Sequence, residues 1–113
     1  MPETSLENAS KFGRVFARTG GVSEAVTEVV KEMGADDFKF DPMVCDGIDK
    51  CKTALLRASK GVLPNNFIEG MICTGGCIGG AGCLTHGEKN KSEVDKYGRE
   101  ALEKTISDAI SFL

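Results

Sequence analysis

The chain has 113 residues, of which 41% are hydrophobic and 27% charged, and its formal net charge is −3. This length fits one compact domain, and the composition is that of an ordinary soluble globular protein. Charges of both signs are interspersed along the chain, and acidic residues outnumber basic ones, which argues against nucleic acid as a partner. The start, MPETSLENASK, has neither an apolar stretch nor a basic run. No segment approaches the ~18 apolar residues of a membrane span, so we expect no signal peptide and no membrane partner.

The cysteine count is odd, at five. Without an export signal a disulfide framework is a poor explanation for these cysteines, and reduced thiols or metal ligands are better ones. We therefore expect the protein to be cytoplasmic, in a reducing compartment.

The chain begins with polar residues and continues into a helical pattern. We expect residues 1–10 to be a loose segment and residues 11–113 to form a single lobe. An apolar stripe at helical spacing predicts a helix over residues 22–33, ended by Gly34 and facing a core. The members of this stripe are Val22, Ala25, Val26, Val29, Val30 and Met33.

The middle of the chain predicts a strand, a helix and a second strand. Residues 38–47 alternate and then turn apolar, which is typical of a strand. Asp46 is placed to cap a helix over residues 48–60, which Gly61 ends. The apolar side of this helix is expected to consist of Ile48, Cys51, Leu55 and Ala58. Residues 66–72 predict the second strand, which leads directly into a cysteine-rich segment.

The last predicted element is a long helix that runs from Ser92 to Leu113, with Asp95 in a capping position. Two strands joined through a helix predict a parallel crossover. The expected fold class is therefore α/β: a small parallel sheet of two strands, with residues 14–17 as a candidate third, flanked by three helices. So small a sheet leaves its edges unpaired, which indicates one lobe of a larger catalytic domain.

The segment 69-EGMICTGGCIGGAGC-83 holds three of the five cysteines and six of the fourteen glycines. It follows the C-terminal end of a predicted strand, where open α/β folds place ligands. Its glycines let the backbone approach a ligand closely and aim amides at sulfide or thiolate. Cys73 and Cys77 therefore suit an iron–sulfur cluster better than structural zinc, which takes two closely spaced pairs. Two thiols are half of the set that a four-iron cluster needs, so further ligands must come from elsewhere.

Other candidate residues have plainer explanations. Cys45 and Cys51 are expected to be buried structural thiols, because cysteine is among the most buried residue types. His86, the single histidine, is expected at the surface. Gly20 and Gly21 precede a helix, but without a P-loop lysine they give little support to a nucleotide site.

Several stretches of the chain resemble the iron-only (FeFe) hydrogenases. The residues 69-EGMICTGGC-77 fit that family's pattern E-x-M-x-C-x-x-G-C, and 79-GGAG-82 is similar to the glycine run that follows it. The residues 16-FARTGGVSEA-25 resemble the family's F-G-A-T-G-G-V-M-E-A segment. Residues 85–106 are similar to the end of the members that lack the G-G-G-Q-P continuation. The resemblance covers nearly the whole chain from about Ser10 and points to the C-terminal part of the H-cluster domain.

The resemblance implies a role for each matched residue. Cys73 and Cys77 match two of the four cysteines that bind the 4Fe-4S part of the H-cluster. Cys77 matches the one whose sulfur also bridges to the two-iron subsite. The implied cofactor-binding positions, in the pocket or the adjoining turn, are Phe16, Thr19, Gly20, Gly21 and Met71. In the family, the cluster reversibly reduces protons to hydrogen, with an electron donor such as ferredoxin.

The departures from the family pattern bear on what the chain does alone. The signatures T-S-C-C-P and M-P-C-x-x-K are absent, and with them the other two cluster cysteines and the proton-relay cysteine. Arg18 stands where the family often has a smaller residue, and the family match gives Cys83 no ligand role. We therefore expect half of an H-cluster site, which needs the N-terminal remainder of the catalytic domain and is inactive alone. The alternatives are a hydrogenase-like iron–sulfur protein for electron transfer, sensing or cluster assembly, and a small zinc or disulfide module.

Overall fold

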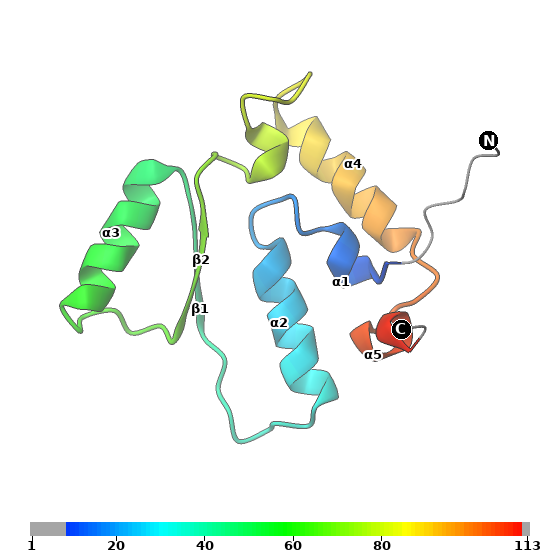
Figure 1. The fold of residues 1–113 in the computed structure, drawn as a ribbon, viewed down its shortest axis with the longest axis horizontal. Coiled ribbons are helices and arrows are strands. Elements are labelled where there is room, and N and C mark those ends of the chain that lie inside the picture. The colour runs from blue at the N-terminus through cyan, green and yellow to red at the C-terminus, as the bar shows by residue number, and fades with distance from the viewer. Residues whose placement is uncertain (1–8, 112–113) are drawn as a thin grey trace.

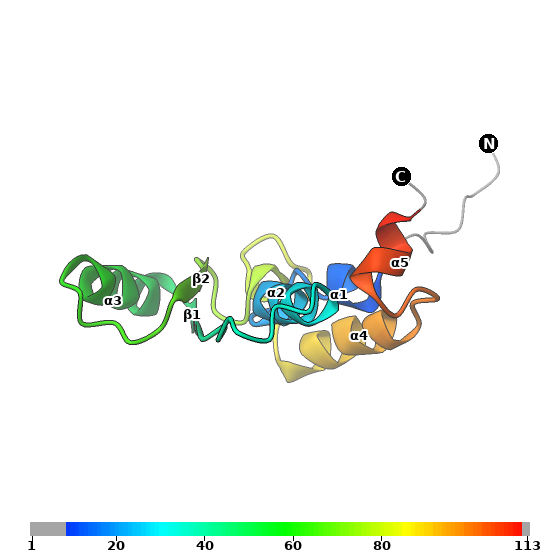
Figure 2. The same ribbon diagram turned by 90° about the horizontal axis from the view of Figure 1, so that it is seen from below.

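The computed structural model of the chain describes residues 9–111. The elements are α1 (Lys11–Arg14), α2 (Gly21–Glu32), β1 (Pro42–Asp46), α3 (Ile48–Ser59), β2 (Phe67–Met71), a 3-10 turn (Cys77–Gly79), α4 (Glu88–Arg99) and α5 (Ile106–Ile110). The two strands separate α3 from all the other helices (Figure 1). Seen at right angles the molecule is a thin slab (Figure 2), and its shortest dimension, 22 Å, is about two helix diameters. None of the helices within residues 9–111 is long and apolar enough to cross a membrane.

The two strands form the predicted parallel pair, so the α/β fold class is confirmed. The register runs from Pro42 opposite Phe67 to Asp46 opposite Met71. The first strand is shorter than predicted, because pairing begins only at Pro42. The candidate third strand over residues 14–17 is wrong, because Arg14 ends α1 and residues 15–17 form a turn. The Ser10 hydroxyl caps α1 by accepting a hydrogen bond from the Gly13 amide at 3.1 Å.

The helix α3 lies against the sheet through a narrow stripe. Cys51 is half-buried and Ala54 is buried, but Ile48 and Leu55 are 63% and 60% exposed. The predicted apolar side is therefore right for Cys51 and wrong for the other three members, Ile48, Leu55 and Ala58. A sheet of two strands is too narrow to cover more than one stripe of the helix. Since Gly47 precedes α3 and no side chain caps it, the predicted capping role of Asp46 is also wrong.

The single long C-terminal helix is wrong as well. The chain forms α4 from Glu88, four residues before Ser92, and then a separate α5. A new helix starts because two groups satisfy its first amides. The Thr105 hydroxyl accepts from the Asp108 amide at 3.1 Å, and the Glu32 carboxylate accepts from the amides of Ile106 and Ser107 at 3.1 and 3.0 Å. Leu113 lies outside the described residues.

The core within residues 9–111 is small. Its buried hydrophobic residues are Val15, Ala25, Cys45, Ala54 and Ala101. Val15 lies beneath Gly98 of α4, where an added Cβ would be 2.9 Å from a Val15 methyl group, so α1 and α4 pack closely. In α2 the predicted stripe is buried only at Ala25, and Met33 is 76% exposed. Many large apolar side chains within the described part of the chain are therefore exposed, and of the large apolar side chains there only Val15 is fully buried.

Candidate metal centre

The cysteine loop, residues 72–83, leaves β2 at the edge where both parallel strands end. Cys77 is exposed, Cys73 and Cys83 are half-buried, and all are free thiols. The turn closes through a hydrogen bond from the Gly76 amide to the Cys73 carbonyl at 3.0 Å. An added Cβ at Gly80 would be 3.2 Å from the Cys73 sulfur, so this glycine leaves space beside the thiol.

The residues Ala17–Gly21, which we call the threonine–glycine segment, pair with the cysteine loop. The Thr19 amide donates to the Gly75 carbonyl, and the Ile78 amide donates to the Ala17 carbonyl, both at 3.1 Å. Gly76 has φ +91, and a Cβ there would be 2.7 Å from both the Ala17 oxygen and the Thr19 nitrogen. A side chain at position 76 is therefore excluded by both backbone conformation and space. Backbone hydrogen bonds therefore join the two stretches that carried the resemblance, the cysteine loop and the threonine–glycine segment.

Asp46, at the end of β1, holds the two segments together. One of its carboxylate oxygens accepts from the Gly75 amide at 2.7 Å and from the Thr19 hydroxyl at 3.1 Å. Lys50 lies 3.4 Å from the other oxygen. The Gly75 amide contributes most to lowering the pKa of Asp46, with help from Thr19 and Lys50. The sequence interpretation placed Asp46 at a helix start and missed this role.

Glu69 of β2, the glutamate of the E-x-M-x-C pattern, is buried. Its carboxylate accepts from the Val22 amide at 3.1 Å and from the Ser23 hydroxyl at 2.9 Å, both in the first turn of α2. A negative charge at this helix end is stabilised by the unpaired amides and by the helix dipole. Glu69 therefore fixes α2 and the threonine–glycine segment relative to the strand that leads into Cys73.

Arg18 is also buried, and it ties the site to the helices around it. Its guanidinium contacts the Glu24 carboxylate of α2 at 2.8 Å and the Asp95 carboxylate of α4 at 2.5 Å. Burial alone would lower the pKa of Arg18, but the hydrogen bonds and charges of Glu24 and Asp95 outweigh it and raise the pKa. The sequence showed Arg18 only as a departure from a family pattern. In the structure, Arg18 links the threonine–glycine segment, to which it belongs, to α2 and α4.

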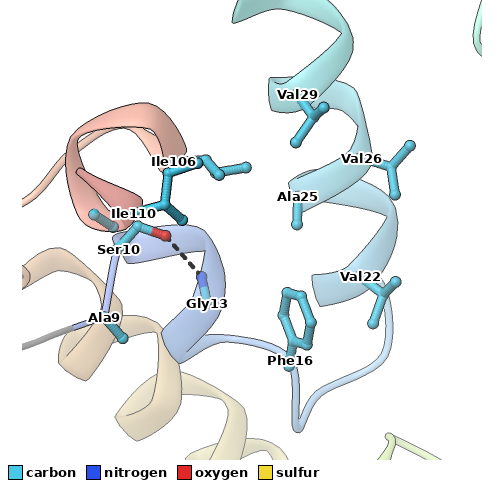
Figure 3. A pocket seen from close by; sticks show the side chains of 11 residues that line it. Ala9, Ser10, Gly13, Phe16, Val22, Ala25, Val26, Val29, Ile106 and Ile110 are labelled. Carbon is cyan, nitrogen blue, oxygen red and sulfur yellow. Dashed lines mark hydrogen bonds between the residues drawn. The ribbon is translucent and has the colours of Figure 1, made fainter. Parts of the chain in front are cut away.

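The predicted site residues divide between two places. Cys73, Cys77, Met71 and the threonine–glycine segment lie along the carboxyl edge of the sheet. Phe16 instead lines an apolar groove between α1, α2 and α5 (Figure 3), whose lining contains neither Met71 nor a cysteine. His86 lies at the surface as predicted, and its Nε2 is 2.9 Å from the Gly80 carbonyl oxygen.

The donor set fits part of an iron–sulfur site. Within residues 9–111, no three side chains of the types His, Cys, Asp and Glu gather closely enough to hold a metal ion. The Cys83 thiol donates to the Cys77 carbonyl at 3.1 Å, so its hydrogen bond is made to the loop backbone. Two thiols beside a glycine backbone match two ligands of a cluster that takes four.

Comparison with protein families matches residues 1–81 to the C-terminal domain of the iron-only hydrogenase large subunit. The match begins at residue 1, within the segment expected to be loose, of which only residues 9 and 10 are described. It ends before Cys83 and α4, so the likeness of the tail lies outside it. Among curated proteins there is no match. The family implies an iron–sulfur cofactor. Because the match covers well over half of the 113 residues, the chain belongs to the iron-only hydrogenase family, within the group defined by the C-terminal domain of its large subunit.

Proposed function

We propose that this chain supplies one side of the H-cluster site of an iron-only hydrogenase, with Cys73 and Cys77 as two of the thiolate ligands. One observation carries the proposal. Both thiols lie on a glycine loop whose position is fixed by the threonine–glycine segment and by Asp46. A loop with incidental cysteines needs no such support. The cluster, when bound, supplies the redox chemistry by which protons are reversibly reduced to hydrogen.

The residues around the two thiols have separate tasks. Gly80 leaves room beside the Cys73 sulfur, and Gly76 lets the loop lie directly on the threonine–glycine segment. Asp46 and Glu69 hold the loop and the start of α2 through their carboxylates. These contacts reduce the ordering that cluster binding would otherwise require.

The rest of the site is supplied by the N-terminal remainder of the catalytic domain, with residues 11–113 as a single lobe. A slab with so small a core leaves large apolar side chains uncovered on its faces. The missing ligands and the missing proton-relay cysteine would arrive with the lobe that covers them. The chain alone is then catalytically inert, and electrons come from a donor such as ferredoxin.

The test is reconstitution with iron and sulfide in the absence of oxygen. The chain would be produced together with a polypeptide carrying the signatures T-S-C-C-P and M-P-C-x-x-K. We expect iron and an electron paramagnetic resonance signal of a four-iron cluster, both lost in Cys73→Ser and in Cys77→Ser. Cys83→Ser is the matched control in the same loop and should keep both.

Three results would separate the alternatives. Stoichiometric zinc with no iron would overturn the cluster proposal in favour of a zinc module. Iron that persists in both Cys73→Ser and Cys77→Ser would overturn the ligand assignment. A normal four-iron cluster signal without hydrogen evolution, in a complex that also carries the two-iron subsite, would favour a protein for electron transfer, sensing or cluster assembly.

A further inference from the structure

A second pair of thiols lies in the crossover unit, away from the cysteine loop. Cys45 is on β1 and is 4% exposed, and Cys51 is in the first turn of α3 and half-buried. Cys45 pairs with Gly70 across the sheet, so positions 45 and 70 face the same side. An added Cβ at Gly70 would be 3.5 Å from the Cys51 sulfur. Cys51 therefore lies directly over the strand pair that carries Cys45.

The hydrogen bonds of the two thiols bring their sulfur atoms to one place. The Cys45 thiol donates to the Glu69 carbonyl at 3.4 Å. The Cys51 thiol is 3.6 Å from the Cys45 carbonyl oxygen and 3.4 Å from the Met71 carbonyl oxygen. Both sulfur atoms are thus directed at the same short length of the β1–β2 pair. Five residues lie between the two cysteines, so the ring that a disulfide would close is small.

The pair also differs in reactivity. Burial, with the neighbouring Cys51 thiol, raises the pKa of Cys45, so this thiol is the weaker first nucleophile. Cys51 is the more accessible member. A surface depression of about 320 Å³ between β1 and α3 is lined by Cys45 and by three charged side chains, Asp49, Lys50 and Arg57, while Cys51 is not part of its lining. The two cations outnumber the one carboxylate in this depression beside the pair, which favours a reagent that carries carboxylates.

We propose that Cys45 and Cys51 form a reversible dithiol–disulfide pair whose oxidant is a small disulfide compound bearing carboxylates. The Cys51 thiolate attacks one sulfur of the reagent, and the reagent's other half leaves as a thiolate that takes up a proton. Cys45 then loses its proton and attacks the Cys51 sulfur, which releases the second half as a thiol. Two protein thiols are oxidised, and one reagent disulfide is reduced to two thiols.

Oxidation of the pair reaches the strand that leads into the cysteine loop. It removes the thiol hydrogen bonds to the carbonyls of Glu69 and Met71, and Met71 lies two residues before Cys73. The same carbonyl of Met71 also accepts from the Gly47 amide at 2.9 Å, which remains. The pair is therefore a modification site whose oxidation changes the hydrogen bonds at the end of β2.

The test uses oxidised glutathione and the full chain, without metal. Trypsin cleaves after Lys39, Lys50 and Lys52 and so separates Cys45 from Cys51, which makes a disulfide between them visible as a linked peptide pair. We expect this linked pair in the wild-type chain. Cys45→Ser should instead accumulate a stable mixed disulfide at Cys51, because the resolving thiol is gone. Cys51→Ser should leave Cys45 largely unmodified, and Cys83→Ser should behave as the wild type.

The proposal is overturned if the wild-type chain gives no linked pair, or if Cys45 stays a free thiol while the loop cysteines react. It is also overturned if Cys51 takes up no glutathione in Cys45→Ser. The wild-type peptide map does not depend on whether either variant folds. Since no cluster is present, the result is independent of the ligand roles proposed for Cys73 and Cys77.

Discussion

The cysteine loop and the crossover unit, residues 42–71, are held in opposite ways. The crossover unit is regular, yet its helix leaves Ile48, Leu55 and Leu56 exposed. The cysteine loop has almost no regular structure, yet buried or partly buried charged groups and backbone bonds fix it at several points. In this chain, regular secondary structure and fixation by long-range contacts therefore do not coincide. The strands matter most through the two carboxylates, Asp46 and Glu69, that they carry to the loop and to α2.

The sharpest way to break the cysteine loop is to add one methyl group at its closest approach. Gly76→Ala should lower the free energy of unfolding by about 3 kcal/mol, because it combines a positive φ with a clash against backbone atoms of residues 17–19. The measurement is denaturant unfolding. Gly75→Ala is the matched control, since Gly75 has φ +86 but nothing within 4 Å of an added Cβ. A cost for Gly76→Ala no larger than for Gly75→Ala would contradict the close approach.

The next effect comes from the buried carboxylate of β2. Glu69→Gln replaces one acceptor oxygen by an amide donor and removes the buried negative charge, so the bonds to the Val22 amide and the Ser23 hydroxyl are weakened. We expect a loss of about 2 kcal/mol in the free energy of unfolding. The exposed Glu93 provides the control, and Glu93→Gln should stay within about 0.5 kcal/mol of the wild type. Equal effects at the two positions would mean that Glu69 does not hold α2.

The carboxylate of β1 gives a smaller effect that depends on pH. The pKa of Asp46 lies below its ordinary value of 3.8 in the folded chain, so its stabilising effect is present above that value. It is lost as the pH falls through the lowered pKa. Asp46→Asn should cost about 1 kcal/mol at neutral pH, and the difference from wild type should vanish in acid.

Unfolding at a series of pH values checks this prediction. The exposed Asp49 lies three residues on, and Asp49→Asn should change stability little at any pH. A gap between Asp46→Asn and the wild type that stays constant into acid would contradict the role assigned to the charge.

The smallest effect is expected on the open side of α3. Leu55→Gln should change the free energy of unfolding by less than about 0.5 kcal/mol, because the side chain is 60% exposed. It should also weaken any self-association seen by sedimentation, since it removes apolar surface. Its neighbour Ala54 is buried, so Ala54→Gln should cost about 1–3 kcal/mol by overpacking. A large loss of stability in Leu55→Gln would show that this side of the helix is covered.

Local sequence patterns predicted the parts of the fold that depend on neighbouring residues. The apolar periodicity of residues 22–33 and the turn signal at Gly34 predicted α2 almost to its ends. Two short apolar runs separated by one helix predicted the parallel pair of strands, because only a few chain topologies are compatible with such a crossover. The spacing of Cys73 and Cys77 among glycines predicted the loop, since few other structures require that composition.

Tertiary contacts decided the rest. An aspartate just before a helix, like Asp46, is a common capping pattern. The actual partners of Asp46, Thr19 and Gly75, lie 27 and 29 residues away in the chain. The break between α4 and α5 depends on Glu32, more than 70 residues earlier in the chain, which no local pattern contains. The sequence by itself thus determined where α2, α3, the two parallel strands and the thiols occur. Only the folded chain determined which carboxylate meets which amide, because a hydrogen bond to a distant backbone group leaves no periodic trace.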